Sequence, residues 1–584
     1  MKIKTLFVAA LAIAIHYPAI AQGQAVPQML AGQGAVDLIM IDGRIKTSSG
    51  WAEAMAIGDG LILAVGDSKA IEGMRAGDTQ VIDLGGNTVL PGLHDMHVHP
   101  IYGGIRAREC SIPQGSSLAN TQQLIRTCVK NTEPGKWITG GQWDASALGQ
   151  VPNHEMLDAI APDNPMLLED TSGHSAWVNT RALEAAGMSS QTRAVPGGII
   201  ERDANGNPTG ILREGAIEQV RKYMPGYSDQ EVRSALEWSL HNMLSYGITT
   251  FTEASVGFTA GSEKELMAYT ALADAGILKQ RARLCLTWVP DNPESEALIA
   301  SRNRYARDRV APDCVKIFLD GVPTDSHTAA MLEPYEGTVE GRDDDASRKG
   351  VLLVAQDALN QAVSRFDAMG LTVKFHAAGD AAVQAGLNSI EAARLANGFS
   401  GQLHNAGHST FVSPQDILRA RTIAATFEVS PYLWGPSPIN DDITKAVGQK
   451  RIDRVWPVRE MIESGALVVP GSDWSVVPSV NPWIGMEILV TREKPGGSDS
   501  SFGKAETITL DQAMDMFTVN SARQRGIADK VGRIEPGMLA DVIVVDQNPY
   551  EVPITRVHKT NVQMTFIAGE RVFDRASSAE ASVH

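Results

Sequence analysis

The chain has 584 residues, of which 43% are hydrophobic and 20% are charged, so it has ample material for a large buried core. The formal net charge is −17 and no cluster of lysine or arginine offsets it, which argues against nucleic acid as a partner. Length alone is compatible with two to four domains, although an α/β barrel commonly uses about 250 residues as one unit.

The first residues have the pattern of a secretory signal peptide. Lys2 and Lys4 precede an apolar run over residues 6–15, and Ala19-Ile20-Ala21 supplies the small residues of a cleavage site before Gln22. The run is shorter than the roughly 20 apolar residues that a membrane-spanning helix needs. We therefore predict a signal peptide over residues 1–21 and a periplasmic or secreted mature protein that leaves the membrane after cleavage.

Both ends of the chain predict short β-strands. Residues 27–90 contain alternating apolar runs separated by turns such as Asp42-Gly43, and residues 531–575 contain similar runs, for example 541–546. Each half is too small to bury a core alone. The two halves are therefore expected to form one small β-sandwich, followed by a polar tail at 576–584.

The central part of the chain, residues 91–530, predicts a (β/α)8 TIM-type barrel. A helical and loop-rich insertion is expected at about 106–246, and elsewhere apolar strands alternate with helical segments. Eight strands are expected: one ending before Pro91, then 248–253, 283–288, 315–319, 371–376, one starting at 402, 423–427 and 467–469. The predicted fold class is therefore α/β.

Polar residues follow the expected strands where a barrel places its chemistry, at the carboxyl ends. They are His97, His99, Lys316, His376, His408 and Asp473. Residues two apart on a strand share a face, so His97 and His99 would point to one place. Each residue alone has an ordinary packing explanation. Together, four histidines, a lysine and an aspartate at one barrel mouth predict a metal site.

The motifs resemble those of the amidohydrolase superfamily, specifically its family 3, the YtcJ-like or N-substituted formamide deformylase-like branch. The matching segments are Pro91-Gly92, Asp95 with His97-Val98-His99, Val315 to Phe318 with Asp320-Gly321, His376 to Asp380, His408, Gly471 to Asp473, and Gly537 to Asp541. The resemblance implies that His97, His99, His376, His408 and Asp473 bind a divalent metal, zinc being expected. It also implies that Lys316 is carboxylated and bridges two ions where two are bound.

The resemblance implies a metal-dependent hydrolase acting on a carbon–nitrogen bond, amide or N-acyl, of a small organic substrate. A bound metal would make hydroxide available at neutral pH, with Asp473 as general base and then acid. One departure lies at His404-Asn405-Ala406-Gly407-His408, where the family usually has Arg-Ile-Glu before the histidine. His404 is thus a lesser ligand candidate, and His94 is expected to support the site or the fold. Homo-oligomer formation is left open.

Other functions and weaker site candidates stay open. An esterase or lactonase could use the same centre, whereas a deaminase is disfavoured because Gly379 stands where deaminases usually have a glutamate. A non-catalytic binding protein would not need the ligand set. Trp143, His174 and His327 lie in segments that resemble pocket-lining loops, with packing as the alternative.

The four cysteines form no CxxC pair, which excludes a cysteine-built zinc site. Cys110 and Cys128 close a short loop, and whether they form a disulfide is left open. Cys285 and Cys314 lie in apolar strands and are expected to be buried thiols.

Overall fold

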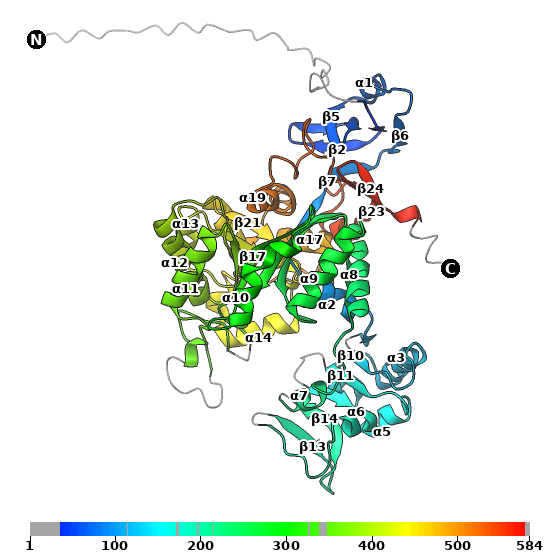
Figure 1. Ribbon diagram of the computed structural model, residues 1–584, viewed down its shortest axis with the longest axis vertical. Helices are drawn as coiled ribbons and strands as arrows, with labels where there is room; N and C mark the ends of the chain where they lie inside the picture. The colour runs from blue at the N-terminus through cyan, green and yellow to red at the C-terminus, as the bar shows by residue number, and fades with distance from the viewer. Residues whose placement is uncertain are drawn as a thin grey trace, which may run out of the picture.

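The computed structural model describes residues 35–113, 115–170, 175–195, 198–213, 215–324, 327–337 and 347–577. The predicted signal peptide at 1–21 and residues 578–584 of the polar tail lie outside these ranges. Within them, no helix has the length and hydropathy of a membrane span. A sheet-rich module formed by both ends of the chain lies at one end of the molecule, the barrel in the middle and an insertion at the other end (Figure 1).

Eight parallel strands form the barrel, and the (β/α)8 prediction is confirmed. In spatial order they are β21 (Leu467–Pro470), β20 (Thr426–Val429), β19 (Asn405–His408), β18 (Thr372–Ala377), β17 (Val310–Phe318), β16 (Arg281–Thr287), β15 (Ile248–Val256) and β8 (Leu93–Val98). Backbone hydrogen bonds close the ring between its first and last strands: Asp473 donates to His97 (2.7 Å) and His99 donates to Trp474 (2.7 Å).

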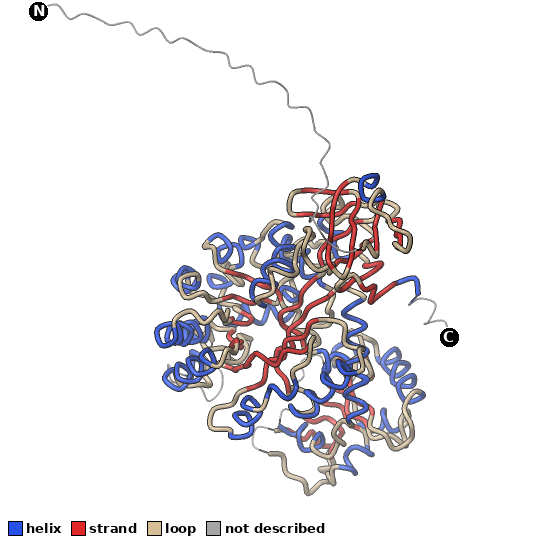
Figure 2. Tube along the Cα trace, turned by 45° about the horizontal axis from the view of Figure 1, so that its top comes forward, coloured by secondary structure: helices blue, strands red, loops and turns tan. Residues whose placement is uncertain are grey.

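Helices surround the strands, as expected when both faces of a parallel sheet must be covered (Figure 2). They are α2 (Pro100–Arg106), α8 (Asp229–Leu244), α9 (Ser262–Asp274), α10 (Pro293–Ala300), α11 (Gln356–Ala368), α12 (Asp380–Asn397), α13 (Pro414–Ala420), α14 (Pro438–Val447), α15 (Gln449–Ile452), α16 (Val458–Glu463), α17 (Pro482–Thr491), α18 (Leu510–Asp515) and α19 (Ser521–Arg525). Helix α8 illustrates how the sequence determines where a helix starts and which of its faces is buried. Ser228 and Glu231 form a capping box at its start, and Val232, Leu236 and Leu240 are buried along one face.

The first barrel strand differs from the prediction. Residues Thr88–Pro91 form β7, which pairs with β22 (Val542–Val545) in the terminal module and lies outside the barrel. The barrel strand is the next segment, β8, which starts after Gly92. The chain passes from one sheet to the other at Pro91-Gly92, where the Gly92 amide donates to the Asp541 carbonyl (2.9 Å). Proline cannot donate to a ladder, so it suits the end of β7.

Two sheets with a shared core make up the terminal module. The first has the order β5 (Leu61–Gly66), β4 (Ala54–Gly58), β1 (Leu38–Ile41), β6 (Gln80–Asp83), with α1 (Ser68–Glu72) beside it. The second has the order β24 (Glu570–Asp574), β23 (Val562–Ile567), β22, β7, β2 (Arg44–Thr47), β3 (Gly50–Ala52). Met40 and Met55 of the first sheet share a core with Val89, Val544 and Phe566 of the second. Strands from both termini therefore lie in one sheet.

The insertion after α2 is richer in strands than predicted. It contains a six-stranded sheet in the order β13 (Ile199–Arg202), β14 (Pro208–Arg213), β12 (Ser175–Val178), β11 (Met166–Asp170), β10 (Ile138–Trp143), β9 (Cys110–Ser111). Its helices are α3 (Leu118–Lys130), α4 (Ala145–Leu148), α5 (His154–Asp158), α6 (Thr180–Ala185) and α7 (Gly215–Arg221). The short strands are punctuated by polar loops, and that composition concealed them in the sequence.

Both cysteine pairs form disulfides. Cys110 bonds to Cys128 in the insertion, which settles the open question. Cys285 bonds to Cys314, so the prediction of two buried thiols was wrong. The reason is that β16 and β17 are neighbours in the barrel and these two residues are aligned in their register.

Candidate metal centre

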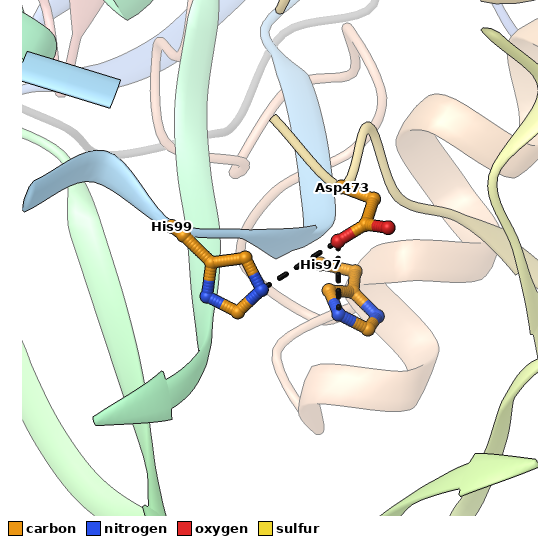
Figure 3. A group of neighbouring side chains, drawn as sticks. All are labelled: His97, His99 and Asp473. Carbon is orange, nitrogen blue, oxygen red and sulfur yellow. Dashed lines mark ion pairs between the residues drawn. The ribbon is translucent and has the colours of Figure 1, made fainter. Parts of the chain in front are cut away.

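His97 and His99 lie where the first barrel strand ends. His97 is in β8, and His99 is the residue that precedes α2. Both side chains are almost completely buried. Their Nε2 atoms approach the same carboxylate oxygen, Oδ1 of Asp473, at 3.6 Å and 3.5 Å (Figure 3). The three side chains together could hold one metal ion.

Asp473 reaches this position because the loop after β21 is tied to strand β8. The Asp95 carboxylate accepts hydrogen bonds from the amides of both His97 (3.1 Å) and Ser472 (3.0 Å). Asp473 itself has a φ of 58°, in the left-handed region that non-glycine residues rarely adopt. Such conformations persist where surrounding contacts enforce them, and they are frequent at active sites.

A carboxylate holds the Nδ1 atom of each of three histidines. His97 donates to Glu428 (2.6 Å), His99 to Glu253 (3.0 Å) and His376 to Asp320 (3.0 Å). This pairing fixes the ring orientation and turns Nε2 to the opposite side, toward Asp473 in His97 and His99, as in metal sites where a carboxylate supports the histidine ligand. Burial alone would lower the pKa of His99, but Asp473 and Glu253 together raise it to about 9.

His376 and His408 lie on the neighbouring strands β18 and β19, and their ring centroids are 4.4 Å apart. The His408 ring is also 4.8 Å from that of His97, so the four predicted histidines are brought together. His408 has a φ of 68°, a second left-handed residue at a strand end. Burial lowers the pKa values of His97 and His408, which favours the neutral form that binds metals.

Lys316 lies on β17 and is also almost fully buried. Its Nζ atom is 5.0 Å from the centroid of the Phe318 ring. Burial, with the nearby Lys374 ammonium as the next cause, lowers the pKa of Lys316 to about 7. At neutral pH much of this amine is uncharged, and the uncharged amine is the form that can react with carbon dioxide.

Comparison with known proteins identifies the family. The sequence profile of the amidohydrolase family matches residues 80–573. The chain belongs to this family. The putative amidohydrolase YtcJ of Bacillus subtilis is 26% identical over 90% of this chain and 96% of its own length. The N-substituted formamide deformylase of Arthrobacter pascens is 25% identical over 93% of this chain and 99% of its own.

A solved structure shows the same fold. An uncharacterised metal-dependent hydrolase from Pyrococcus furiosus superposes with a TM-score of 0.69 at 24% identity. The match covers 88% of this chain and all of that one. The predicted resemblance and the barrel architecture are therefore confirmed for this amidohydrolase.

The three weaker candidates for substrate contact have different surroundings. Trp143 is buried in the core of the insertion, where its indole donates to the Leu168 carbonyl (2.8 Å); substrate contact by Trp143 stays a prediction. His327 is buried and its ring stacks on Tyr335 at 4.3 Å; substrate contact by His327 stays a prediction. His174 lies outside the described residues.

The two additional histidines of the amidohydrolase barrel have separate environments. His404 contacts Asp367 through Nε2 (2.9 Å) and accepts from the Val373 amide through Nδ1 (2.9 Å), so both of its nitrogens are engaged in the fold. His94 is fully buried in β8, and burial lowers its pKa to about 3.

A groove of about 720 Å³ opens beside the histidines at the ends of β15, β16 and β17. Two of its lining rings stack on the candidate ligands: Phe258 on His99 (4.8 Å) and Phe318 on His376 (5.6 Å). Val256, Val289 and Leu298 also line it. An apolar surface therefore adjoins the cluster.

The sequence interpretation did not assign roles to Glu253, Asp320 and Glu428. Each is an acidic residue within or directly after an apolar strand. This sequence pattern could have identified them as candidate site residues. Glu428, for example, is flanked by Phe427 and Val429 in a fully buried strand. Buried carboxylates need a partner, so acidic residues at such positions indicate a site.

Proposed function

We propose that this amidohydrolase uses a metal centre to cleave a carbon–nitrogen bond of a small organic substrate. The observation that carries the proposal is the convergence of His97 and His99 on one oxygen of Asp473. Carboxylates hold the far side of both rings, so the nitrogens that face Asp473 are the ones free to bind a metal.

The residues present fit a divalent ion such as zinc. Imidazole nitrogen and carboxylate oxygen are ligand types that zinc accepts, and the donor atoms of His97, His99 and Asp473 lie within 4.8 Å of one another. His376, His408 and, once carboxylated, Lys316 would supply ligands for a second ion. When bound, the metal supplies a nucleophile from water at neutral pH and polarises the scissile carbonyl.

Asp473 is proposed as the proton carrier. Its carboxylate lies between the two imidazoles, where it would accept a proton from the attacking water and later deliver it to the leaving nitrogen. Asp95 supports this role because it holds the amide of Ser472, next to Asp473, against strand β8.

The groove supports a substrate with an apolar group. Phe258 and Phe318 form apolar walls next to the candidate ligands, which suits an apolar acyl or amine portion. One relative is named for N-substituted formamides. We propose substrates of this general kind, a small amide or N-acyl compound with an apolar substituent.

The residues of the candidate centre favour some alternative reactions over others. An ester or lactone would use the same residues, so esterase activity is the second candidate. A deaminase of the expected kind is disfavoured, because a Cβ atom on Gly379 would lie 2.0 Å from the Ala330 carbonyl oxygen. A glutamate at that position has no room.

Chelator-sensitive hydrolysis tests the proposal. The purified protein would be assayed against N-acyl amino acids, formamides, esters and lactones, before and after chelation and after addition of Zn²⁺. We expect cleavage of at least one amide, lost with the chelator and restored by zinc. Activity on amides that is indifferent to chelation, or activity on esters alone, would refute the proposed reaction.

We also infer export to the periplasm or the medium, supported by the charged, apolar and small-residue pattern of residues 1–21. N-terminal sequencing of the expressed protein would then find a chain starting near Gln22. Retention of Met1 in the active protein would contradict export by this route.

A further inference from the structure

A buried lysine is linked to one of the candidate ligands through a single carboxylate. Lys374 lies on β18, two residues before His376, and Glu428 lies on β20. The Oε2 atom of Glu428 accepts from Nζ of Lys374 (3.0 Å) and from Nδ1 of His97 (2.6 Å). All three side chains are at most 2% exposed. Through Glu428, Lys374 of the fifth barrel strand (β18) is therefore linked to His97 of the first barrel strand (β8).

Glycines leave room for this connection. A Cβ atom on Gly407 would lie 2.6 Å from the Phe375 carbonyl oxygen and 2.8 Å from Oε2 of Glu428. A Cβ atom on Gly471 would lie 2.8 Å from Oε1 of Glu428 and 2.3 Å from Cβ of His97. Neither glycine has a positive φ, so backbone conformation does not require glycine at these positions. Close approach does, because the Glu428 carboxylate at both positions, the Phe375 carbonyl at Gly407 and Cβ of His97 at Gly471 leave no space for a Cβ atom.

We propose that Lys374 is a positioning residue for the metal centre and acts through Glu428 on His97. The proposal rests on the proposed function, in which His97 binds the metal. A buried carboxylate needs hydrogen-bond partners, and Lys374 supplies one to Oε2 of Glu428. Held in this way, Glu428 fixes Nδ1 of His97 and so aims Nε2 at Asp473. Lys374 also ties the strand of His376 to that of His97.

Metal binding tests the proposal without any substrate. Lys374→Met, Glu428→Gln and the double variant would be prepared as full-length protein and loaded with Co²⁺. Competition with a chelator gives the affinity, and the visible spectrum of Co²⁺ reports the geometry of its ligands. Loss of a group that supports a ligand typically weakens metal binding by about 10–100-fold. We expect a loss of this order, with a changed spectrum, for Lys374→Met.

The double variant shows whether Lys374 affects metal binding through Glu428 or independently of it. Because Lys374 acts through Glu428, the double variant should bind Co²⁺ no more weakly than Glu428→Gln alone. Additive losses would overturn the route through Glu428. Should Lys374→Met fail to fold, Lys374→Gln provides a polar side chain that is shorter and lacks the ammonium, and it is expected to show the same spectral change.

Asp367→Asn is the matched control. Asp367 also holds a buried histidine, His404 (2.9 Å), and a cation, Arg394 (2.8 Å), but away from the candidate centre. The Asp367→Asn variant should lower the stability of the protein and leave the Co²⁺ spectrum unchanged. A wild-type spectrum and affinity in Lys374→Met would overturn the positioning role. Absence of Co²⁺ binding in the wild-type protein would instead refute the metal centre itself.

Discussion

Asp473 is the residue on which the proposed reaction depends most. Replacing it with asparagine keeps the side chain's size but removes the proton acceptor. Proton transfer by a positioned side chain typically contributes about 10²–10⁴-fold to rate. We expect kcat to fall by at least about 100-fold in Asp473→Asn while most of the bound metal is kept. Steady-state kinetics and metal analysis check this.

The control for this variant is Asp546→Asn, an exposed aspartate in the terminal module that bonds to Asn561. It should leave kcat and metal content unchanged. Full activity in Asp473→Asn would remove Asp473 from the proton-transfer role.

In the proposed centre, Lys316 would decide whether a second ion is bound. Because its pKa is lowered to about 7, the uncharged amine is available for carboxylation at neutral pH. We expect Lys316→Met to reduce the metal content per chain, and we expect reconstitution of the wild-type protein to improve when bicarbonate is present. Lys279→Met, which removes a partly exposed lysine paired with Glu570, serves as the control. Equal metal content in Lys316→Met and wild type would exclude the bridging role.

At the scale of elements, acid sensitivity can be traced to the contact between Asp367 of α11 and the segment between β18 and β19. Burial alone would raise the pKa of Asp367, but hydrogen bonds from His404, Ser400 and Asn397 hold it well below its usual range. Since the folded pKa lies below the unfolded value, the stabilisation is complete above about pH 4 and is lost as the pH falls further.

Asp367→Asn should therefore unfold more easily than wild type at pH 7, by about 2 kcal/mol, since hydrogen bonds to charged groups contribute on this order. The difference should shrink between about pH 4 and pH 2. Unfolding midpoints measured across this range provide the check. A difference that stays constant down to pH 2 would show that ionisation of Asp367 does not matter.

The elements that carried strong patterns were predictable, and those that depend on distant partners were not. Apolar strands followed by polar residues predicted seven of the barrel positions, and the four histidines singled out by this pattern lie together. The support of His97 by Glu428 was not predictable, because the two residues are 331 positions apart. The Cys285–Cys314 bond was missed because the register between β16 and β17 decides it. Residues 88–91 (β7) were wrongly assigned to the barrel, because their apolar run is compatible with both the barrel sheet and the sheet of the terminal module.

At the scale of the whole molecule, the two ends of the chain depend on each other. Strand β22 lies between β7 and β23, and its residues Val542 and Val544 are fully buried. Burying a side chain of this size contributes about 1.5–3 kcal/mol. Deletion of residues 541–584 should therefore leave the N-terminal strands without a core and yield insoluble or unfolded protein.

Deletion of residues 578–584 alone is the control, because it leaves β22, β23 and β24 in place. It should match the full-length protein in soluble yield and melting temperature. A soluble, cooperatively melting protein that lacks residues 541–584 would show that the N-terminal strands fold without the C-terminal ones.

The central claim is that the strand-end cluster of this amidohydrolase binds metal. Anomalous diffraction at the zinc absorption edge from crystals of zinc-loaded protein tests it most directly. We predict a peak within about 2.0–2.2 Å of Nε2 of His97 and His99 and of a carboxylate oxygen of Asp473, the usual zinc–ligand distances. An active protein without an anomalous peak at this position would contradict the account.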